Sequence, residues 1–213
     1  MKPGDGPRAR RRPTKRRDGR RKAPGPRRPV TARGGAVNGW RGRGAGRHPG
    51  RVLIRDAVSE DWDAIWPFFH RIVTAGETYT YPRDLDREAG RALWMLDPPG
   101  HTVVAVDEDG TVLGSAKMNP NHMGAASHIA GASFMVDPAH GGKGVGRALG
   151  EYALRWARAE GYRAMQFNAV VETNTGAVAL WKSLGFEIMT TLPEAFLHPT
   201  KGYVGLHIMY QRF

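Results

Sequence analysis

Cysteine is missing from this sequence of 213 residues. Its absence excludes disulfide bonds, thiolate metal sites and a cysteine nucleophile. Long apolar runs are missing too. None approaches the roughly 18 residues of a membrane span, and no apolar stretch follows the N-terminal charges as it would in a secretory signal. We therefore expect a cytoplasmic protein that does not associate with a membrane.

Acidic and large apolar residues are scarce in residues 1–50. This segment holds 17 Lys and Arg residues against only Asp5 and Asp18, a net charge of +15. The whole chain carries +12, so residues 51–213 carry −3. A segment rich in Arg, Gly and Pro cannot bury enough surface to offset the entropy lost on ordering. We expect residues 1–50 to be a disordered basic tail and residues 51–213 to be one folded domain.

Two readings of this tail remain open. Basic Arg/Gly arms bind nucleic acid electrostatically, and a nonspecific contact of this kind is one role for the tail. The other reading is an incidental or untranslated extension. Arg51–Arg55 looks like the first strand of a domain, and a bacterial gene can start translation at a valine codon there. Mass spectrometry of the native N-terminus distinguishes the two readings.

Glycine, in contrast, is abundant within one segment, Phe134–Leu149. Its apolar residues run into an Asp-Pro pair that predicts the end of a strand, and its glycines then open a periodic helix over Arg147–Glu160. Such a loop lets backbone N–H groups turn toward one point at a helix N-terminus, where the helix dipole favours a phosphate. Lys143 and Arg147 add positive charge at the same place.

Two common phosphate loops do not fit this segment. A Walker loop needs Ser or Thr directly after its lysine, and none follows Lys143. A dinucleotide loop belongs to the first strand of a βαβ unit, whereas this loop follows several predicted strands. The order of strand, V-D-P-A-H-G-G-K-G-V-G, helix and strand, followed by N-x-x-A-x-x-L-W-x-x-x-G-F over Asn174–Phe186, resembles the GCN5-related N-acetyltransferase (GNAT) superfamily. The resemblance covers Arg51–Phe213.

The remaining pattern predicts an α+β domain, and the resemblance implies the same order of elements. Ser59 before acidic residues looks like a helix N-cap. The predicted helices are one through Trp62, Ile65, Phe69 and Ile72, then Leu85–Leu96, Arg147–Glu160 and Thr175–Leu184. The predicted strands are Val52–Arg55, His101–Val106, Thr111–Met118, His128–Val136, Ala164–Val170, Phe186–Thr191 and Tyr203–Tyr210. We expect a GNAT fold, a mixed, mostly antiparallel central sheet of about seven strands flanked by about four helices.

The resemblance implies acetyl-CoA as co-substrate and no metal. In the GNAT fold the strand carrying the glycine loop splays from the next strand, and the acetyl-pantetheine arm lies in that V-shaped gap. Backbone groups near Met135 would polarise the thioester and stabilise the oxyanion, and the pyrophosphate would lie on Gly142–Arg147. The implied cofactor-binding residues are Phe134, Met135, Val136, Gly141, Gly142, Lys143, Gly144, Val145, Gly146, Arg147, Asn174 and Trp181.

Two positions depart from the family pattern. Gly141 stands where Arg or Gln is usual, so one side-chain contact to phosphate is missing, and we expect Lys143 and Arg147 to compensate. Trp181 stands where many members carry a tyrosine thought to protonate the departing thiolate. An indole N–H cannot act as that acid. The proton for the departing thiolate must then come from another group, or the thiolate must leave with help from water or backbone donors.

Asparagines are the catalytic candidates on the acceptor side. Asn168 lies on the strand facing the gap, and Asn174 opens the next helix. An amide is no base, but it can fix a carboxylate or a water that relays a proton. Taken singly, a strand-end position and a helix cap explain them as well. With Ser127–Ile129 they resemble the fungal proline-analogue (azetidine-2-carboxylate) N-acetyltransferases, in which such asparagines orient a small amino acid. A further asparagine of that subfamily, near the position of Gly131, is absent.

The other expected acceptor-binding residues are Glu77, Tyr79, Tyr81 and His128, together with Asn168. The first three lie where many GNAT enzymes place the loop over the acceptor, although aromatic loop residues equally often fill a core. His128 is either a base near neutral pH or a polar residue on one face of a strand. We expect Phe196–Tyr203 between the last two strands, where it closes the acceptor pocket or forms a homodimer contact.

These observations together predict an N-acetyltransferase. Acetyl would pass from acetyl-CoA to the amine of a small molecule, an amino acid or an analogue, by direct attack in a ternary complex, with water or a histidine taking the proton. Two alternatives stay open. A peptide or protein N-terminal acetyltransferase would have an acidic groove and an open cleft. A nucleic-acid-binding protein with a degenerate CoA-binding domain would explain the missing Arg or Gln and the missing Tyr.

Overall fold

A sheet runs through the middle of the domain, with helices on both faces. The computed structural model describes residues 52–213, so the predictions for residues 1–50 lie outside the described residues. The strands are β1 (Leu53–Asp56), β2 (His101–Val106), β3 (Val112–Pro120), β4 (Ile129–Val136), β5 (Ala164–Val171), β6 (Glu187–His198) and β7 (Gly202–Arg212). The α-helices are α1 (Asp61–Ala75), α2 (Arg87–Trp94), α3 (Val145–Ala159) and α4 (Thr175–Ser183), with short 3-10 turns at Gly124–Ala126 and Pro138–His140. The predicted class and the predicted order of elements are confirmed.

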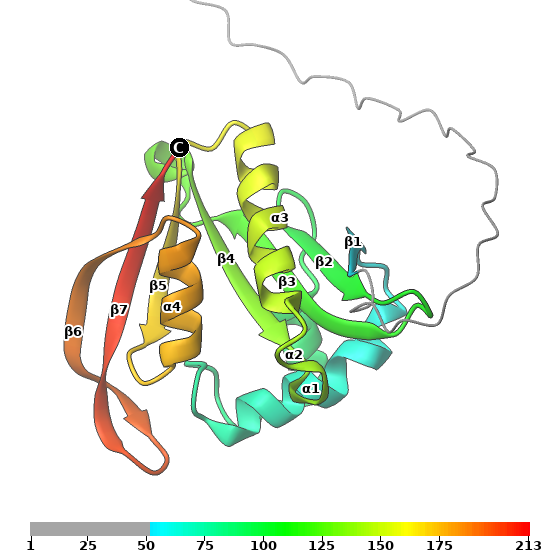
Figure 1. Cartoon of the computed structure of the whole chain (residues 1–213), viewed down its shortest axis with the longest axis horizontal. Helices are drawn as coiled ribbons and strands as arrows, with labels where there is room; N and C mark the ends of the chain where they lie inside the picture. Colours follow the sequence, from blue (N-terminus) through cyan, green and yellow to red (C-terminus); the bar gives the residue numbers. More distant parts are fainter. Residues whose placement is uncertain (1–51) are drawn as a thin grey trace, which may run out of the picture. The chain divides into compact units, whose positions relative to one another are not determined.

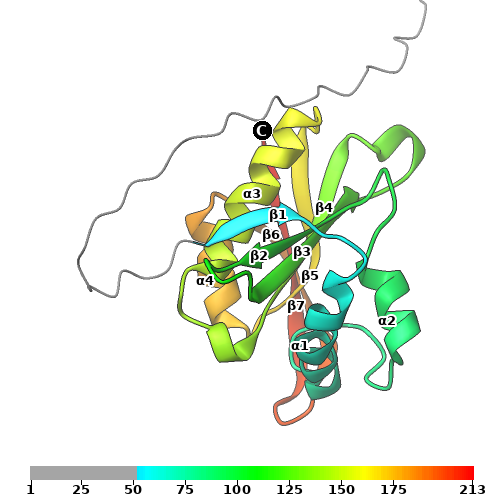
Figure 2. The same ribbon diagram turned by 90° about the vertical axis from the view of Figure 1, so that its right-hand side faces the viewer.

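The strands form one sheet in the order β1-β2-β3-β4-β5-β7-β6 (Figure 1). Every neighbouring pair is antiparallel except β4 and β5, which run parallel. Figure 2 shows α1 and α2 on one face of the sheet and α3 and α4 on the other. One apolar core, with Phe167 and Trp181, fills the α3 and α4 side, and a second, with Phe69 and Trp94, fills the α1 and α2 side. This two-sided cover explains why β2 is buried along almost its whole length.

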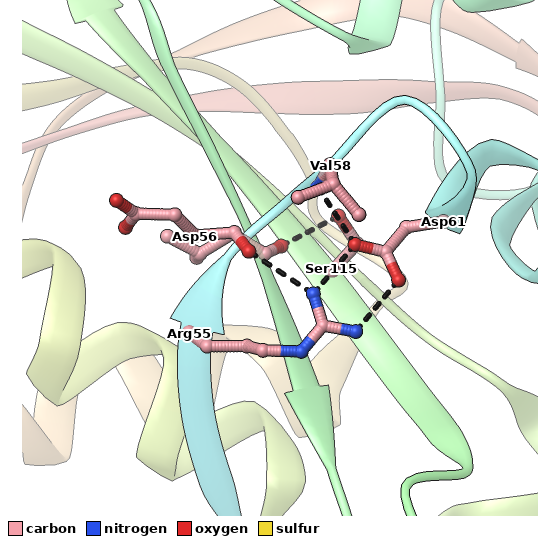
Figure 3. A network of polar contacts seen from close by, with 6 residues as sticks. Arg55, Asp56, Val58, Asp61 and Ser115 are labelled. Atoms are coloured by element: carbon pink, nitrogen blue, oxygen red, sulfur yellow. Dashed lines mark hydrogen bonds and ion pairs between the residues drawn. The ribbon is translucent and has the colours of Figure 1, made fainter.

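The start of α1 differs from the prediction. Ser59 is not the N-cap, because Glu60 takes the position before the helix and makes no side-chain cap. Instead the Asp61 carboxylate accepts the Val58 N–H at 2.8 Å and two guanidinium bonds from Arg55 at 2.6 and 2.7 Å (Figure 3). A carboxylate at the positive end of a helix stabilises that end electrostatically. Because the Arg55 guanidinium on β1 binds the Asp61 carboxylate, Asp61 rather than Ser59 provides the stabilising side chain at the start of α1.

The C-terminal hairpin also differs from the prediction. Most of Phe196–Tyr203 belongs to the last two strands, since β6 extends to His198 and β7 begins at Gly202, and only residues 199–201 connect them. Phe196 and His198 are buried whereas Leu197 is exposed. Alternation of buried and exposed side chains is typical of a strand. The sequence does not show it clearly, because polar residues flank this short stretch. The segment does not line the cavity described below.

No helix within residues 52–213 is both long and apolar enough to cross a membrane. In the same part of the chain, no group of three or more His, Asp or Glu side chains could hold a metal ion.

Candidate functional site

Strands β4 and β5 separate along their length. They pair only at Ile129 with Ala164, Ala130 with Met165, and Gly131 with Gln166. Beyond these positions β4 continues to pair with β3, and β5 with β7. Figure 1 shows the two strands close at their starts and diverging toward their ends. A cavity of about 540 Å³ lies in this gap, lined by residues of both strands, of α4 and of the loop after α1.

The backbone of β4 forms one wall of the cavity. The Tyr79 hydroxyl donates to the Phe134 carbonyl at 2.6 Å from within the gap. A Cβ on Gly114 would lie 2.7 Å from the Met135 carbonyl, so the polar groups of Met135 face β3. Since successive residues of a strand point their polar groups to opposite sides, the N–H groups of Phe134 and Val136 face the gap. Of the three residues expected to contact the pantetheine arm, Phe134 and Val136 thus turn their backbone N–H groups toward the gap, and Met135 turns its own toward β3.

The glycine loop leads into the N-terminus of α3. Gly142 and Gly144 have φ values of +76° and +78°, and a Cβ on either would meet no atom within 4 Å. Gly144 is the N-cap, gives no side-chain cap, and no acidic residue lies in the first turn of α3. The first N–H groups of the helix therefore lack a side-chain cap, and the loop before them is open at both glycines. This arrangement suits an anion, as the sequence predicts.

Lys143 and Arg147, the basic residues near the glycine loop, differ in their contacts. Lys143 is exposed. The Arg147 guanidinium donates to the Ser183 hydroxyl at 2.8 Å and lies 3.7 Å from the Glu151 carboxylate. Arg147 thus ties α3 to the end of α4. Of the two cations expected to compensate for Gly141, only Lys143 is free of a side-chain partner among the described residues.

Trp181 is buried in an aromatic cluster at the α4 side of the cavity. Its ring centroid lies 4.7 Å from that of Phe134 and 5.0 Å from that of Phe167. Phe167 in turn stacks on Phe186 at 4.2 Å. The indole therefore contributes shape and apolar surface to the cavity. None of the four described aromatic side chains in this cluster is ionisable.

Amide side chains line the opposite part of the cavity. Asn168 Nδ2 donates to Asn121 Oδ1 at 2.7 Å, and Gln166 Nε2 donates to Asn168 Oδ1 at 2.7 Å. Sequence reasoning missed Asn121, which follows β3 and lies over Gly131. A Cβ on Gly131 would lie 3.0 Å from Asn121 Oδ1. Asn121 thus places a side-chain amide beside Gly131.

Asn174 caps a helix and also borders the cavity. It is the N-cap of α4, where its side-chain oxygen accepts the Ala177 N–H at 3.3 Å. It also lines the cavity. Capping fixes the orientation of the side chain, so that its amide N–H₂ group remains as a donor.

The ionisable side chains that line the cavity are Tyr79, Tyr81 and Lys117, and no Asp, Glu or His is among its described lining residues. Burial, with a smaller contribution from Tyr81, raises the pKa of the Tyr79 phenol well above its ordinary value. Tyr79 therefore stays protonated and acts as a donor. Lys117 was missed by sequence reasoning, because its position on β3 is not within any motif.

Two predicted acceptor residues lie away from the cavity. Glu77 is exposed and does not line it. His128 precedes β4, at the end where β4 and β5 are still paired, and its carbonyl accepts the Arg163 N–H at 2.9 Å. Its ring Nδ1 lies 3.1 Å from the Ala125 carbonyl oxygen. The structure therefore does not bring Glu77 or His128 to Asn168.

Comparisons with known proteins agree with this geometry. Residues 55–186 match the model of the acetyltransferase (GNAT) family. The N-acetyltransferase aca1 of Schizosaccharomyces pombe is 33% identical over 116 residues, 54% of this chain and 56% of that protein. Protein SPT10 of Saccharomyces cerevisiae is 30% identical over 83 residues, 39% of this chain and 13% of that protein. The chain thus spans about half or less of the length of these curated relatives.

Solved structures share the fold. A GCN5-related N-acetyltransferase from Kribbella flavida matches with a TM-score of 0.74 and 58% identity over 76% of this chain and 98% of that one. A phosphinothricin acetyltransferase from Sinorhizobium meliloti, in complex with acetyl-CoA, matches with a TM-score of 0.69 and 23% identity over 76% of this chain and 88% of that one. Since the family model covers well over half of the sequence, the chain belongs to the acetyltransferase (GNAT) family.

Proposed function

We propose that this protein transfers acetyl from acetyl-CoA to the amine of a small molecule, an amino acid or an analogue. The observation that carries the proposal is the gap between β4 and β5. One of its walls offers backbone N–H groups, and the other offers side-chain amides. Such a site holds a thioester and an amine side by side, which is what acyl transfer in a ternary complex requires.

The chain has groups that fit acetyl-CoA. The open N-terminus of α3 suits the pyrophosphate, with Lys143 as the nearby cation. The backbone N–H groups of Phe134 and Val136 face the gap and suit the pantetheine arm and the carbonyl oxygen of the acetyl group. Bound acetyl-CoA would supply an activated acyl carbon. The donors of β4 would stabilise the negative charge that develops on its oxygen.

The amine must lose a proton without a carboxylate or histidine beside it. Among the described residues that line the cavity, none can act as a strong base at neutral pH. The amides of Asn121 and Asn168 are placed to hold a water, which can relay the proton to solvent. Tyr79 and Tyr81 are the hydroxyl donors near the gap, and the buried indole of Trp181 is not an acid. The departing thiolate would take its proton from water or from one of these donors.

The lining of the cavity favours a small molecule over a peptide or protein acceptor. The peptide alternative predicts an acidic groove, whereas the described residues of this cavity include no Asp or Glu. The nucleic-acid alternative concerns residues 1–50, which lie outside the described residues.

Calorimetric titration of acetyl-CoA into the full-length protein tests the cofactor half of the proposal. We expect micromolar binding, and Gly144→Trp should weaken it at least about tenfold, or ~1.4 kcal/mol, because the indole would fill the anion site. Gly161→Trp is the matched control. Gly161 also has a positive φ, of +84°, and open space around its Cβ, but it follows the other end of α3.

Equal weakening by both variants would show that strain at a positive-φ position, not the anion site, controls binding. Absence of binding in the unmodified protein would overturn the enzyme proposal. Release of CoA during incubation with amino acids then tests the acceptor half.

A further inference from the structure

The charge of the cavity lining is unbalanced. Lys117 is the cationic side chain of the described lining, and no anionic side chain accompanies it. The other polar groups are neutral hydroxyls and amides, among them Asn119, Asn121 and Asn168. A cavity with one cation and no anion attracts an acceptor that carries a negative charge and repels one with a second positive charge.

The contacts of Lys117 leave its charge unpaired. Its Nζ donates to the Leu93 carbonyl at 2.6 Å, a neutral acceptor, and an ammonium has two further N–H donors. The same Nζ lies 5.5 Å from the ring centroid of Tyr81 and 5.7 Å from that of Trp94. No carboxylate of residues 52–213 lies within 4.0 Å of it. Aromatic rings hold the ammonium in place without neutralising it.

The position of Lys117 on β3 places it on the acceptor side of the gap. It pairs in register with Ser133, the neighbour of Phe134, whose backbone faces the gap. The contacts of Lys117 with α2 and Tyr81 place it on the α1 and α2 face of the sheet. Phe134 and Trp181 pack on the opposite face. The cation is thus separated by the sheet from the proposed pyrophosphate site.

We propose that Lys117 binds the carboxylate of an amino-acid acceptor and so determines which amines are acetylated. This role rests on the proposed function. The ammonium would hold the carboxylate through charge-assisted hydrogen bonds. The amides of Asn121 and Asn168 would then face the amine and its water. A diamine or polyamine would place a second cation against Lys117 and is disfavoured.

The test compares each standard amino acid with its primary carboxamide, which keeps the amine and removes the negative charge. Initial rates are measured with full-length protein and saturating acetyl-CoA. The unmodified protein should prefer the acids. Lys117→Met should lower kcat/KM for the acids about 10- to 100-fold, mainly through KM. The same change should alter kcat/KM for the carboxamides less than about threefold.

Further variants separate charge from structure. Lys117→Arg should retain most of the preference for acids, and Lys117→Glu should reverse it toward the carboxamides. Lys201→Met, in the exposed turn of the β6 and β7 hairpin, should change neither rate. The acetyl-CoA Kd and the melting temperature of each variant show whether the fold and cofactor site persist.

Three patterns of measurable rates would overturn the proposal: an unmodified protein that prefers carboxamides, an equal loss for acids and carboxamides in Lys117→Met, or no effect of that change. If neither class is acetylated although acetyl-CoA binds, the amino-acid assignment falls together with the role of Lys117. If acetyl-CoA does not bind, the proposed function itself fails.

Discussion

Asp61 fixes the start of α1 relative to β1. Its side chain is 7% exposed, and it joins β1 to the start of α1 through Arg55 and Val58. The hydrogen bonds from Arg55 lower the pKa of Asp61, with a further contribution from the Val58 N–H, although burial opposes the shift. Helix α1 carries Ile72, which lines the cavity. Loss of this tie should therefore loosen the acceptor side of the gap.

Asp61→Asn should lower the free energy of unfolding by about 1–3 kcal/mol at pH 7, because it removes charge-assisted bonds to a largely buried group. The pKa of Asp61 is lowered by folding. Its contribution is therefore present above the pKa of an unfolded aspartate, about 3.9, and is lost as pH falls through the lower folded value. Urea denaturation at neutral pH and at successively lower pH should show the difference between the two proteins shrinking below about pH 4.

Asp63→Asn provides the control for burial. Asp63 lies in the same turn and pairs with Arg87, but its side chain is 81% exposed. An exposed pair contributes only about 0–1 kcal/mol, so this variant should stay close to the unmodified protein. Similar losses in both variants would contradict the explanation from burial.

The residues of the site that the sequence revealed are those close together in the chain. Gly142 and Gly144 could be predicted because a phosphate loop is a local feature, and Asn168 and Asn174 because they share one strand-to-helix connection. Asn121 and Lys117 reach the cavity only through the register of β3 with β4, which pairs Asn119 with Gly131. No local pattern marks that register. The same limit explains the expectation for His128, which directly precedes β4 at the end where β4 and β5 are still paired.

At the scale of elements, α3 and α4 approach each other closely beside the cavity. Gly150 is buried in the middle of α3, and a Cβ there would lie 2.7 Å from Leu184 Cδ1 and 3.0 Å from the Trp181 ring. Arg147 and Ser183 join the ends of the same two helices. The position of Trp181, and with it the shape of the cavity, therefore depends on the absence of a side chain at residue 150.

Gly150→Ala should destabilise the protein by up to about 2 kcal/mol. Overpacking of this contact costs about 1–3 kcal/mol, whereas alanine gains at most about 1 kcal/mol in helix propensity. Gly176→Ala, at an exposed position of α4 where a Cβ would meet nothing within 4 Å, isolates the propensity gain and should be neutral or slightly stabilising. Thermal unfolding of both variants measures the difference. A stabilised Gly150→Ala would show that the two helices can separate without cost.

The whole domain is a sheet that divides between β4 and β5, with different chemistry on its two sides. The α3 and α4 face carries the open helix N-terminus and the aromatic cluster around Trp181, and the α1 and α2 face carries Tyr79, Tyr81 and Lys117. A cofactor held from the first face and an acceptor held from the second would meet in the gap. The fold could be predicted from periodicity and turns because each element is signalled locally, whereas the extent of β6 could not.

The two-sided site predicts that residues 51–213 are sufficient for activity. The family match begins at residue 55, and every contact described at the site lies within residues 52–213. Deletion of residues 1–50 removes a net charge of +15 but none of these contacts. The shortened protein should therefore retain its acetyl-CoA Kd and its kcat/KM within about twofold.

Its affinity for single-stranded RNA should fall sharply if the tail binds nucleic acid, and that affinity in the full-length protein should decrease steeply with salt. Loss of turnover on deletion would contradict the division of the chain at residue 51.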